Sequence, residues 1–269
     1  MERMLASYME KKKQGILVVS FGTSYEETRK KNIDVMEQKI GDEFKEYEIR
    51  RAFTSEIIRR KLEKRDNIKI DNVPQALERM KNEGFEKVLV SSLHIIPGEE
   101  YEKIQKAVAK FDDQFEELKM AKPLLYSKED HDEVIKALQR QIPNLKEDES
   151  LVFMGHGSEH HANSAYIVIQ YLMEKHHSMN NVFMGTVEGY PELDDIIPTL
   201  EERKIKKVHL MPFMLVAGDH AINDMASDEE DSWRTILEEK GFEVKTHLVG
   251  LGENEEIQNI FVNRVKEMF

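Results

Sequence analysis

The stretch Leu-Val-Phe-Met-Gly-His-Gly-Ser-Glu at residues 151–159 joins a short apolar run to a histidine between two glycines. Four apolar residues followed by glycine are typical of a buried strand, and glycine lets the backbone turn sharply where the strand ends. We therefore expect His156 at a strand tip. An imidazole there can carry a proton or bind a metal ion near neutral pH without a large pKa shift.

Similar apolar runs recur along the chain and alternate with helical patterns. The expected strands cover residues 16–20, 47–53, 88–93, 120–125, 151–154, 182–186, 208–213 and 244–249. Between them, apolar residues recur at helical spacing. We expect one long helix over residues 219–240 and a last helix over residues 253–268. Regular alternation of strands and helices favours parallel sheets covered on both faces.

The pattern restarts in the second half of the chain. Residues 20–24 align with residues 155–159, which pairs Phe21 with His156. Residues 87–100 align with residues 207–220, which pairs Glu100 with His220. The sequence therefore predicts an α/β fold with two similar doubly wound halves, each a four-stranded parallel sheet flanked by helices. We place the halves at residues 1–127 and 128–269; the sequence leaves open whether the last helix packs on the second half or crosses to the first.

Three polar side chains follow three successive strands of the second half. Glu188 lies 32 residues after His156, and His220 lies 32 residues after Glu188. Because ligands of parallel sheets bind at the carboxyl ends of strands, we expect these side chains to converge in a cleft between the halves. Two imidazoles and a carboxylate suit a divalent first-row metal and leave coordination positions open. A lone histidine is more simply interpreted as a structural residue. Two histidines and a glutamate at matched positions near glycines instead favour a metal site.

Composition excludes several classes of protein. The chain has 269 residues, a net charge of −13 and no cysteine. The negative charge argues against a nucleic-acid partner, and the missing cysteines exclude disulfides and thiolate ligands. There is no apolar run long enough to cross a membrane, and residues 1–13 lack the apolar core of a signal peptide. We therefore expect a cytoplasmic protein without a membrane partner.

Motifs of common nucleotide enzymes and hydrolases are also missing. No Gly-x-Gly-x-x-Gly follows the first strand, and the chain has no phosphate loop with Gly-Lys-Ser/Thr. Residues 155–158 do not match the Gly-x-Ser-x-Gly nucleophile elbow. A nucleotide enzyme or a serine hydrolase is therefore disfavoured.

Five segments in order resemble the anaerobic cobalt chelatases of cobalamin biosynthesis: residues 16–24, 93–101, 154–160, 186–191 and 212–220. The resemblance extends from Gly15 to the end of the chain. It implies the fold of class II chelatases, which is related to that of ferrochelatase. It also implies ATP-independent insertion of Co²⁺ into sirohydrochlorin or precorrin-2. Co²⁺ and the tetrapyrrole would then be substrates, with no tightly bound cofactor.

The resemblance further assigns roles to individual residues. It implies that His156 and His220 bind the metal and take up protons from pyrrole nitrogens, that Glu188 completes the metal site, and that Glu100 assists from the first half. We expect Phe21, the apolar counterpart of His156, to offer a flat surface to the macrocycle. His94 is a candidate for lining the cleft, although a structural role is as good an interpretation.

The acidic macrocycle also needs cations, for which Arg51 and its neighbour Arg50 are candidates. Two other functions remain open at this point: a chelatase of the same fold for Fe²⁺ or Ni²⁺, and a carrier that binds metal or tetrapyrrole without turnover. The sequence is equally compatible with a monomer and with a homo-oligomer.

Overall fold

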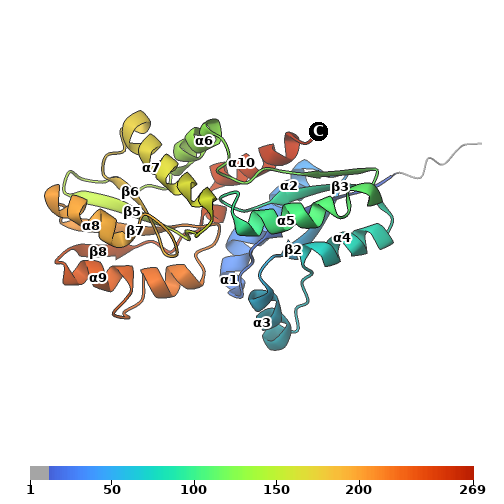
Figure 1. Ribbon diagram of the computed structural model, residues 1–269. Coiled ribbons are helices and arrows are strands. Elements are labelled where there is room, and N and C mark those ends of the chain that lie inside the picture. Colours follow the sequence, from blue (N-terminus) through green and yellow to red (C-terminus); the bar gives the residue numbers. More distant parts are fainter. Residues whose placement is uncertain (1–11) are drawn as a thin grey trace, which may run out of the picture.

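Two parallel sheets form the centre of the protein, one in each half (Figure 1). This computed structural model describes residues 12–269; most of the N-terminal segment that we interpreted as lacking a signal peptide lies outside the described residues. The strand orders are β2-β1-β3-β4 and β6-β5-β7-β8, so the predicted architecture of two four-stranded parallel sheets is confirmed. The strands are β1 Lys13–Ser20, β2 Glu48–Phe53, β3 Phe85–Ser92, β4 Glu117–Met120, β5 Glu149–Gly155, β6 Val182–Thr186, β7 Lys207–Phe213 and β8 Glu243–Thr246.

Helices cover both faces of each sheet. The α-helices are α1 Glu26–Arg29, α2 Val35–Glu43, α3 Glu56–Asp66, α4 Val73–Asn82, α5 Glu99–Ala109, α6 Lys128–Leu138, α7 Ser164–His177, α8 Leu193–Glu202, α9 Trp233–Glu239 and α10 Glu255–Lys266. The shorter helices are η1 Lys30–Asp34, η2 Asp112–Gln114, η3 His161–Asn163, η4 Ala221–Met225 and η5 Leu251–Glu253, of which η1 and η4 are π-helical. Within residues 12–269, none of the helices combines the length and the apolar character that crossing a membrane requires.

The two halves repeat each other in backbone detail. Gly22 and Gly157 follow the central strands β1 and β5, and both have positive φ, +95° and +81°. In each half, the residues that follow the next strand hydrogen-bond to the residues that follow the central strand. The Ser55 backbone N–H donates to the Phe21 carbonyl (3.3 Å), and the Glu188 N–H donates to the His156 carbonyl (2.7 Å). The expected pairing of Phe21 with His156 therefore has a structural counterpart, and Ser55 is the equivalent of Glu188.

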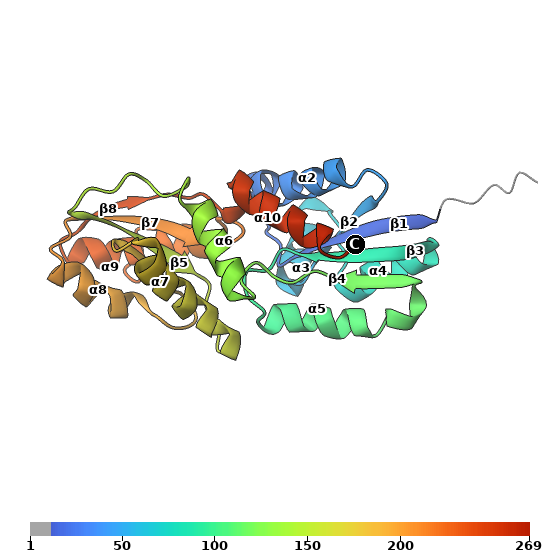
Figure 2. The same cartoon turned by 90° about the horizontal axis from the view of Figure 1, so that it is seen from above.

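One hydrophobic core runs through both halves. A single cluster of buried side chains contains Ile16 of β1, Val134 of α6, Phe213 of β7 and Phe261 of α10. The last helix, α10, contacts α6 and also α2 and β3 of the first half, as Figure 2 shows. The other face of each sheet has a separate core. The division into residues 1–127 and 128–269 stays a prediction.

The prediction of one long helix over residues 219–240 is wrong. The structure has the π-helical turn η4 and the short helix α9, with residues 226–232 between them in turns. Ser232 caps α9 by accepting a hydrogen bond from the Thr235 N–H (3.1 Å), and Ser227 hydrogen-bonds to the backbone of Asn223. Serine side chains that bond locally to the backbone compete with a continuous helix, and four consecutive acidic residues at 228–231 add repulsion.

The fourth strand also differs from the expectation of residues 120–125. β4 covers Glu117–Met120 and pairs with residues 87–90 of β3. Pro123 has no N–H to give to a sheet ladder. The following N–H groups of Leu124 and Leu125 bind instead to the carbonyls of His94 and Ile95. The apolar character of residues 120–125 is therefore that of a buried connection toward α6.

Candidate metal site

The structure brings together the three side chains that the sequence singled out in the second half. His156 follows β5, Glu188 follows β6, and His220 lies at the start of η4 after β7. One ligand atom from each residue lies within 4.8 Å of the others. We call these three residues the metal triad. Both histidines are partly buried and Glu188 is exposed, so an ion can reach them.

The hydrogen bonds of the two imidazoles leave one nitrogen of each available. The Nδ1 atom of His220 lies 2.5 Å from the Asp224 carboxylate, and the Nδ1 atom of His156 lies 2.9 Å from the Gly157 carbonyl. Since both partners are acceptors, each Nδ1 carries the proton. The Nε2 lone pairs are then free for a metal ion. The two rings lie edge to face, with centroids 4.7 Å apart.

Asn163 ties the loop that carries His156 to the loop that carries Glu188. Its Oδ1 accepts a hydrogen bond from the Ser158 N–H (3.0 Å), and its Nδ2 donates to the Tyr190 carbonyl (2.6 Å). The two loops pass so closely that a Cβ atom on Gly189 would lie 2.4 Å from the Asn163 Oδ1 atom. The glycine there is therefore required by close approach of the two loops.

The Tyr166 side chain of α7 packs against the start of the loop that carries His156. Its ring is buried, and a Cβ atom on Gly155 would lie 2.6 Å from it. Burial raises the pKa of Tyr166 to about 12, although backbone hydrogen bonds from Gly157 and His156 oppose the shift. The phenol therefore stays neutral, and its buried ring packs closely against the backbone at Gly155.

In the first half, Glu100 and His94 lie near each other in a poorly solvated region after β3. Burial raises the pKa of Glu100, but the hydrogen bonds from the Lys103 ammonium (2.7 Å) and from Thr54, together with the nearby Lys103 charge, outweigh it and leave that pKa below its usual value. Burial also lowers the pKa of His94 to about 4. Its Nδ1 lies 3.0 Å from the Ser92 hydroxyl, and its Nε2 has no hydrogen-bond partner among the described residues. Glu100 is thus a carboxylate beside a neutral imidazole.

The other two predicted substrate residues differ in what they can offer. Phe21 follows β1 and is 47% exposed, so its ring is accessible. Arg51 of β2 is bound by Glu37 (2.6 Å) and Asp34 (2.5 Å), both on the helical segment after β1. Its charge is matched within the chain, and the structure does not group it with the metal triad.

Two polar contacts join the halves beside these loops. The Tyr25 hydroxyl of the first half donates to Asp219 (2.8 Å), the residue before His220. The Glu102 carboxylate of α5 lies 3.0 Å from the Nε2 atom of His160, in the loop after His156. The strand ends of the two sheets therefore face each other at the junction.

Two supporting residues were missed in the sequence. Asp224 lies four residues after His220, a spacing that places two side chains on one helical face, so the pair could have been found. Asn163 is different, because its partners Ser158 and Tyr190 come from separate loops. Only the folded chain brings those loops together.

A family model described as "Cobalt chelatase (CbiK)" matches residues 14–269 of this chain. Two curated relatives are similar over nearly the whole length. The sirohydrochlorin cobaltochelatase of Salmonella typhimurium is 46% identical over 93% of this chain and 94% of its own. The sirohydrochlorin cobaltochelatase CbiKC of Nitratidesulfovibrio vulgaris is 35% identical over 94% of this chain and 89% of its own.

The fold has counterparts among solved structures. The structure described as "SirB from Bacillus subtilis with Fe3+" superposes with a TM-score of 0.64 at 16% identity, covering 95% of each chain. At that identity the likeness concerns the fold alone, and it agrees with the chelatase-like architecture of two parallel sheets.

Proposed function

The chain belongs to the cobalt chelatase (CbiK) family, and from this premise we propose that it inserts Co²⁺ into sirohydrochlorin with the metal triad as the metal-delivering site. The observation that carries the proposal is the convergence of His156, Glu188 and His220 within 4.8 Å at three strand ends. Three protein ligands leave positions on the ion for pyrrole nitrogens. Imidazole and carboxylate ligands also hold Co²⁺ less firmly than thiolates and can release it.

The two histidines of the metal triad can also accept the protons that the macrocycle loses. Two N–H protons leave the macrocycle as Co²⁺ enters, so each insertion needs two acceptors. An imidazole cannot bind the ion and a proton through the same Nε2 atom at once. We infer that pyrrole nitrogens displace the imidazoles from the ion one after the other. Each displaced Nε2 atom is then free to accept a proton.

Asp224 supports proton uptake by His220 in this exchange. Its carboxylate faces Nδ1 of His220, so the imidazolium formed after proton uptake is paired with a negative charge. Glu100 stands in the first half at the position equivalent to His220, and its lowered pKa keeps it ionised. We propose that Glu100 assists proton removal from the opposite side of the junction, and that Phe21 contacts the face of the macrocycle.

The test is anaerobic metal insertion, followed by the change in absorption of the macrocycle. The proposal predicts multiple turnovers with Co²⁺ and without nucleotide. Parallel reactions with Co²⁺, Fe²⁺ and Ni²⁺ at equal free concentrations decide the metal, because the ligand set itself does not discriminate these ions. Tight stoichiometric binding without turnover would overturn catalysis in favour of a carrier.

The choice between sirohydrochlorin and precorrin-2 is decided by comparing the two as substrates in that assay. The cytoplasmic location, the absence of a bound cofactor and the oligomeric state stay predictions.

A further inference from the structure

We propose that one face of helix α3, formed by Ile57, Lys61 and Lys64, binds the peripheral carboxylates and the apolar edge of the macrocycle. This inference rests on the proposed function. Residues 57, 61 and 64 are spaced by four and three positions, which places them along one side of a helix. All three are exposed, and Ile57 is 80% exposed. We call these residues the α3 face.

The start of α3 lies beside Phe21. Ser55 caps the helix by accepting a hydrogen bond from the Ile58 N–H (3.3 Å), and the Ser55 N–H itself binds the Phe21 carbonyl (3.3 Å). Ser55 is also the equivalent of Glu188 in the repeat. Where the second half carries a metal ligand, the first half therefore begins a helix. Its first turn carries the exposed Ile57, and the residue that caps it hydrogen-bonds to the backbone of the exposed Phe21.

The next turns of α3 lie beside the loop after β1 that carries Ser24 and Tyr25. The Lys61 Nζ atom lies 5.7 Å from the centroid of the Tyr25 ring, and Arg65 donates to the Ser24 carbonyl (2.5 Å). The Tyr25 hydroxyl in turn contacts Asp219, the neighbour of His220. The Tyr25 side chain therefore lies between Lys61 and Asp219, the residue before His220 of the metal triad.

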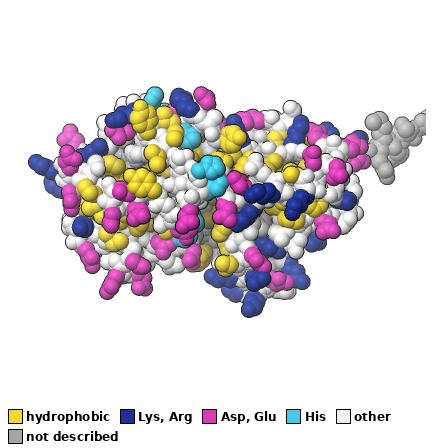
Figure 3. Space-filling model, viewed as in Figure 1, with side chains coloured by type: hydrophobic (Ala, Val, Ile, Leu, Met, Phe, Trp, Pro, Cys, Tyr) yellow, Lys and Arg dark blue, Asp and Glu magenta, His cyan; other side chains and the backbone are white. Residues whose placement is uncertain are grey.

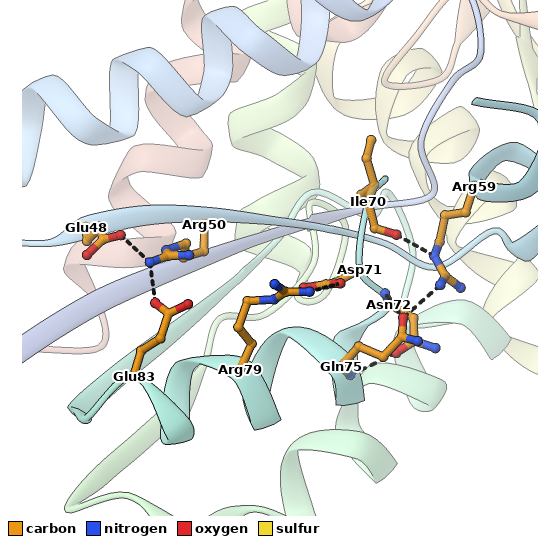
Figure 4. Close-up of polar contacts among 9 residues, drawn as sticks. All are labelled: Glu48, Arg50, Arg59, Ile70, Asp71, Asn72, Gln75, Arg79 and Glu83. Atoms are coloured by element: carbon orange, nitrogen blue, oxygen red, sulfur yellow. Dashed lines mark hydrogen bonds and ion pairs between the residues drawn. The ribbon is translucent and has the colours of Figure 1, made fainter. Parts of the chain in front are cut away.

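The cations around α3 fall into two groups. Figure 4 shows three arginines held by partners: Arg50 by Glu48 and Glu83, Arg79 by Asp71, and Arg59 by the Ile70 carbonyl and Gln75.

Lys61 and Lys64, in contrast, form no ion pair with any residue between 12 and 269. Lysine and arginine side chains gather over α3 at the lower edge of the view in Figure 3. In a chain of net charge −13, two lysines without an ion-pair partner among residues 12–269, on the helix that begins beside Phe21, are suited to a polycarboxylate.

The experiment compares Lys61→Glu/Lys64→Glu with wild type in anaerobic Co²⁺ insertion. We expect the KM for sirohydrochlorin to rise about tenfold or more, because two attractive charge contacts become repulsive. The kcat and the KM for Co²⁺ should stay within about twofold, because the α3 face does not touch the metal triad. Lys61→Gln/Lys64→Gln should fall between the two.

The matched control is Lys110→Glu/Lys240→Glu, which makes the same change in net charge at two exposed lysines at the ends of α5 and α9. This control should keep the wild-type KM for sirohydrochlorin within about twofold. Equal KM values for the α3 and control variants would overturn the inference. Circular dichroism of both variants checks that they keep the overall helix content of the wild type.

A second readout does not depend on turnover. Equilibrium binding of metal-free sirohydrochlorin, followed by its fluorescence, should weaken in Lys61→Glu/Lys64→Glu and, by a few-fold, in Ile57→Ser. If wild-type protein inserts no metal, the proposed function fails, whereas equal binding by the α3 and control variants rejects the α3 face alone.

Discussion

The two halves of this protein share one topology and carry different chemistry at the same positions. Where the second half has His156, Glu188 and His220, the first has Phe21, Ser55 and Glu100. The backbone repeats at two points between the halves: a glycine of positive φ follows each central strand, and an equivalent hydrogen bond joins the residues that follow the first two strands of each half. The repeated fold therefore fixes these positions, and we propose that the side chains there separate metal binding from macrocycle binding.

The two halves also differ in the side chains that hold these residues in place. His220 has Asp224 behind it, and the loops of His156 and Glu188 are joined through Asn163. Phe21 lies instead beside the start of α3, where the exposed Lys61 and Lys64 form no ion pair with any residue between 12 and 269. A metal site needs ligands held in a fixed geometry, whereas a surface for a flat acidic molecule needs area and charge.

The largest expected effect comes from removing the histidines of the second half. We expect His156→Ala and His220→Ala each to lower kcat/KM for Co²⁺ insertion by about a hundredfold or more, because each variant loses a ligand and a proton acceptor. Steady-state insertion assays measure the loss. Full activity in either variant would remove that residue from the mechanism.

Asp224→Ala sharpens the comparison, since His220 is held by a carboxylate, whereas Glu100 is held by the Lys103 ammonium. We expect Co²⁺ affinity to fall by about ten- to a hundredfold, because His220 loses the group that orients its ring. Titration of the protein with Co²⁺ measures the affinity. Asp231→Ala, which removes an exposed carboxylate from the nearby turn, is the control and should bind Co²⁺ as wild type does.

Phe21→Ala tests the first half. The KM for sirohydrochlorin should rise by a few-fold to about tenfold through lost contact with the macrocycle, while Co²⁺ binding stays unchanged. Ile167→Ala, on an exposed part of α7, removes a comparable apolar side chain and should have no effect. An unchanged macrocycle affinity in Phe21→Ala would count against the flat-surface role.

The smallest effect concerns stability rather than activity. His94 has a pKa of about 4 in the folded protein because of burial, whereas an unfolded histidine titrates near pH 6.5. Between these values only the unfolded chain binds the proton, so the free energy of unfolding decreases as pH falls from 6.5 toward 4.

His94→Gln should therefore lose less stability than wild type between pH 7 and pH 5, as measured by urea unfolding. Parallel pH dependence in the two proteins would mean that His94 is not held neutral by the fold.

Much of this arrangement could be predicted from the sequence, because it is encoded locally. Buried strands are short apolar runs, and the two 32-residue intervals place His156, Glu188 and His220 at one sheet edge. The long helix over residues 219–240 failed for a local reason as well, since Ser227 and Ser232 bind the backbone and interrupt it. What the sequence could not supply was tertiary: the joining of two loops by Asn163 and the position of α3 beside Tyr25 depend on contacts between distant segments.

The most direct test of the central claim is Co²⁺ binding in the absence of tetrapyrrole, followed by the visible absorption and X-ray absorption spectra of the bound ion. The account predicts one Co²⁺ per chain with two imidazole nitrogens and a carboxylate oxygen among its ligands. That binding should be lost or strongly weakened in His156→Ala, Glu188→Ala and His220→Ala and retained in Phe21→Ala and Glu100→Gln. Unchanged spectra in the second-half variants, or loss of the ion in the first-half variants, would contradict it.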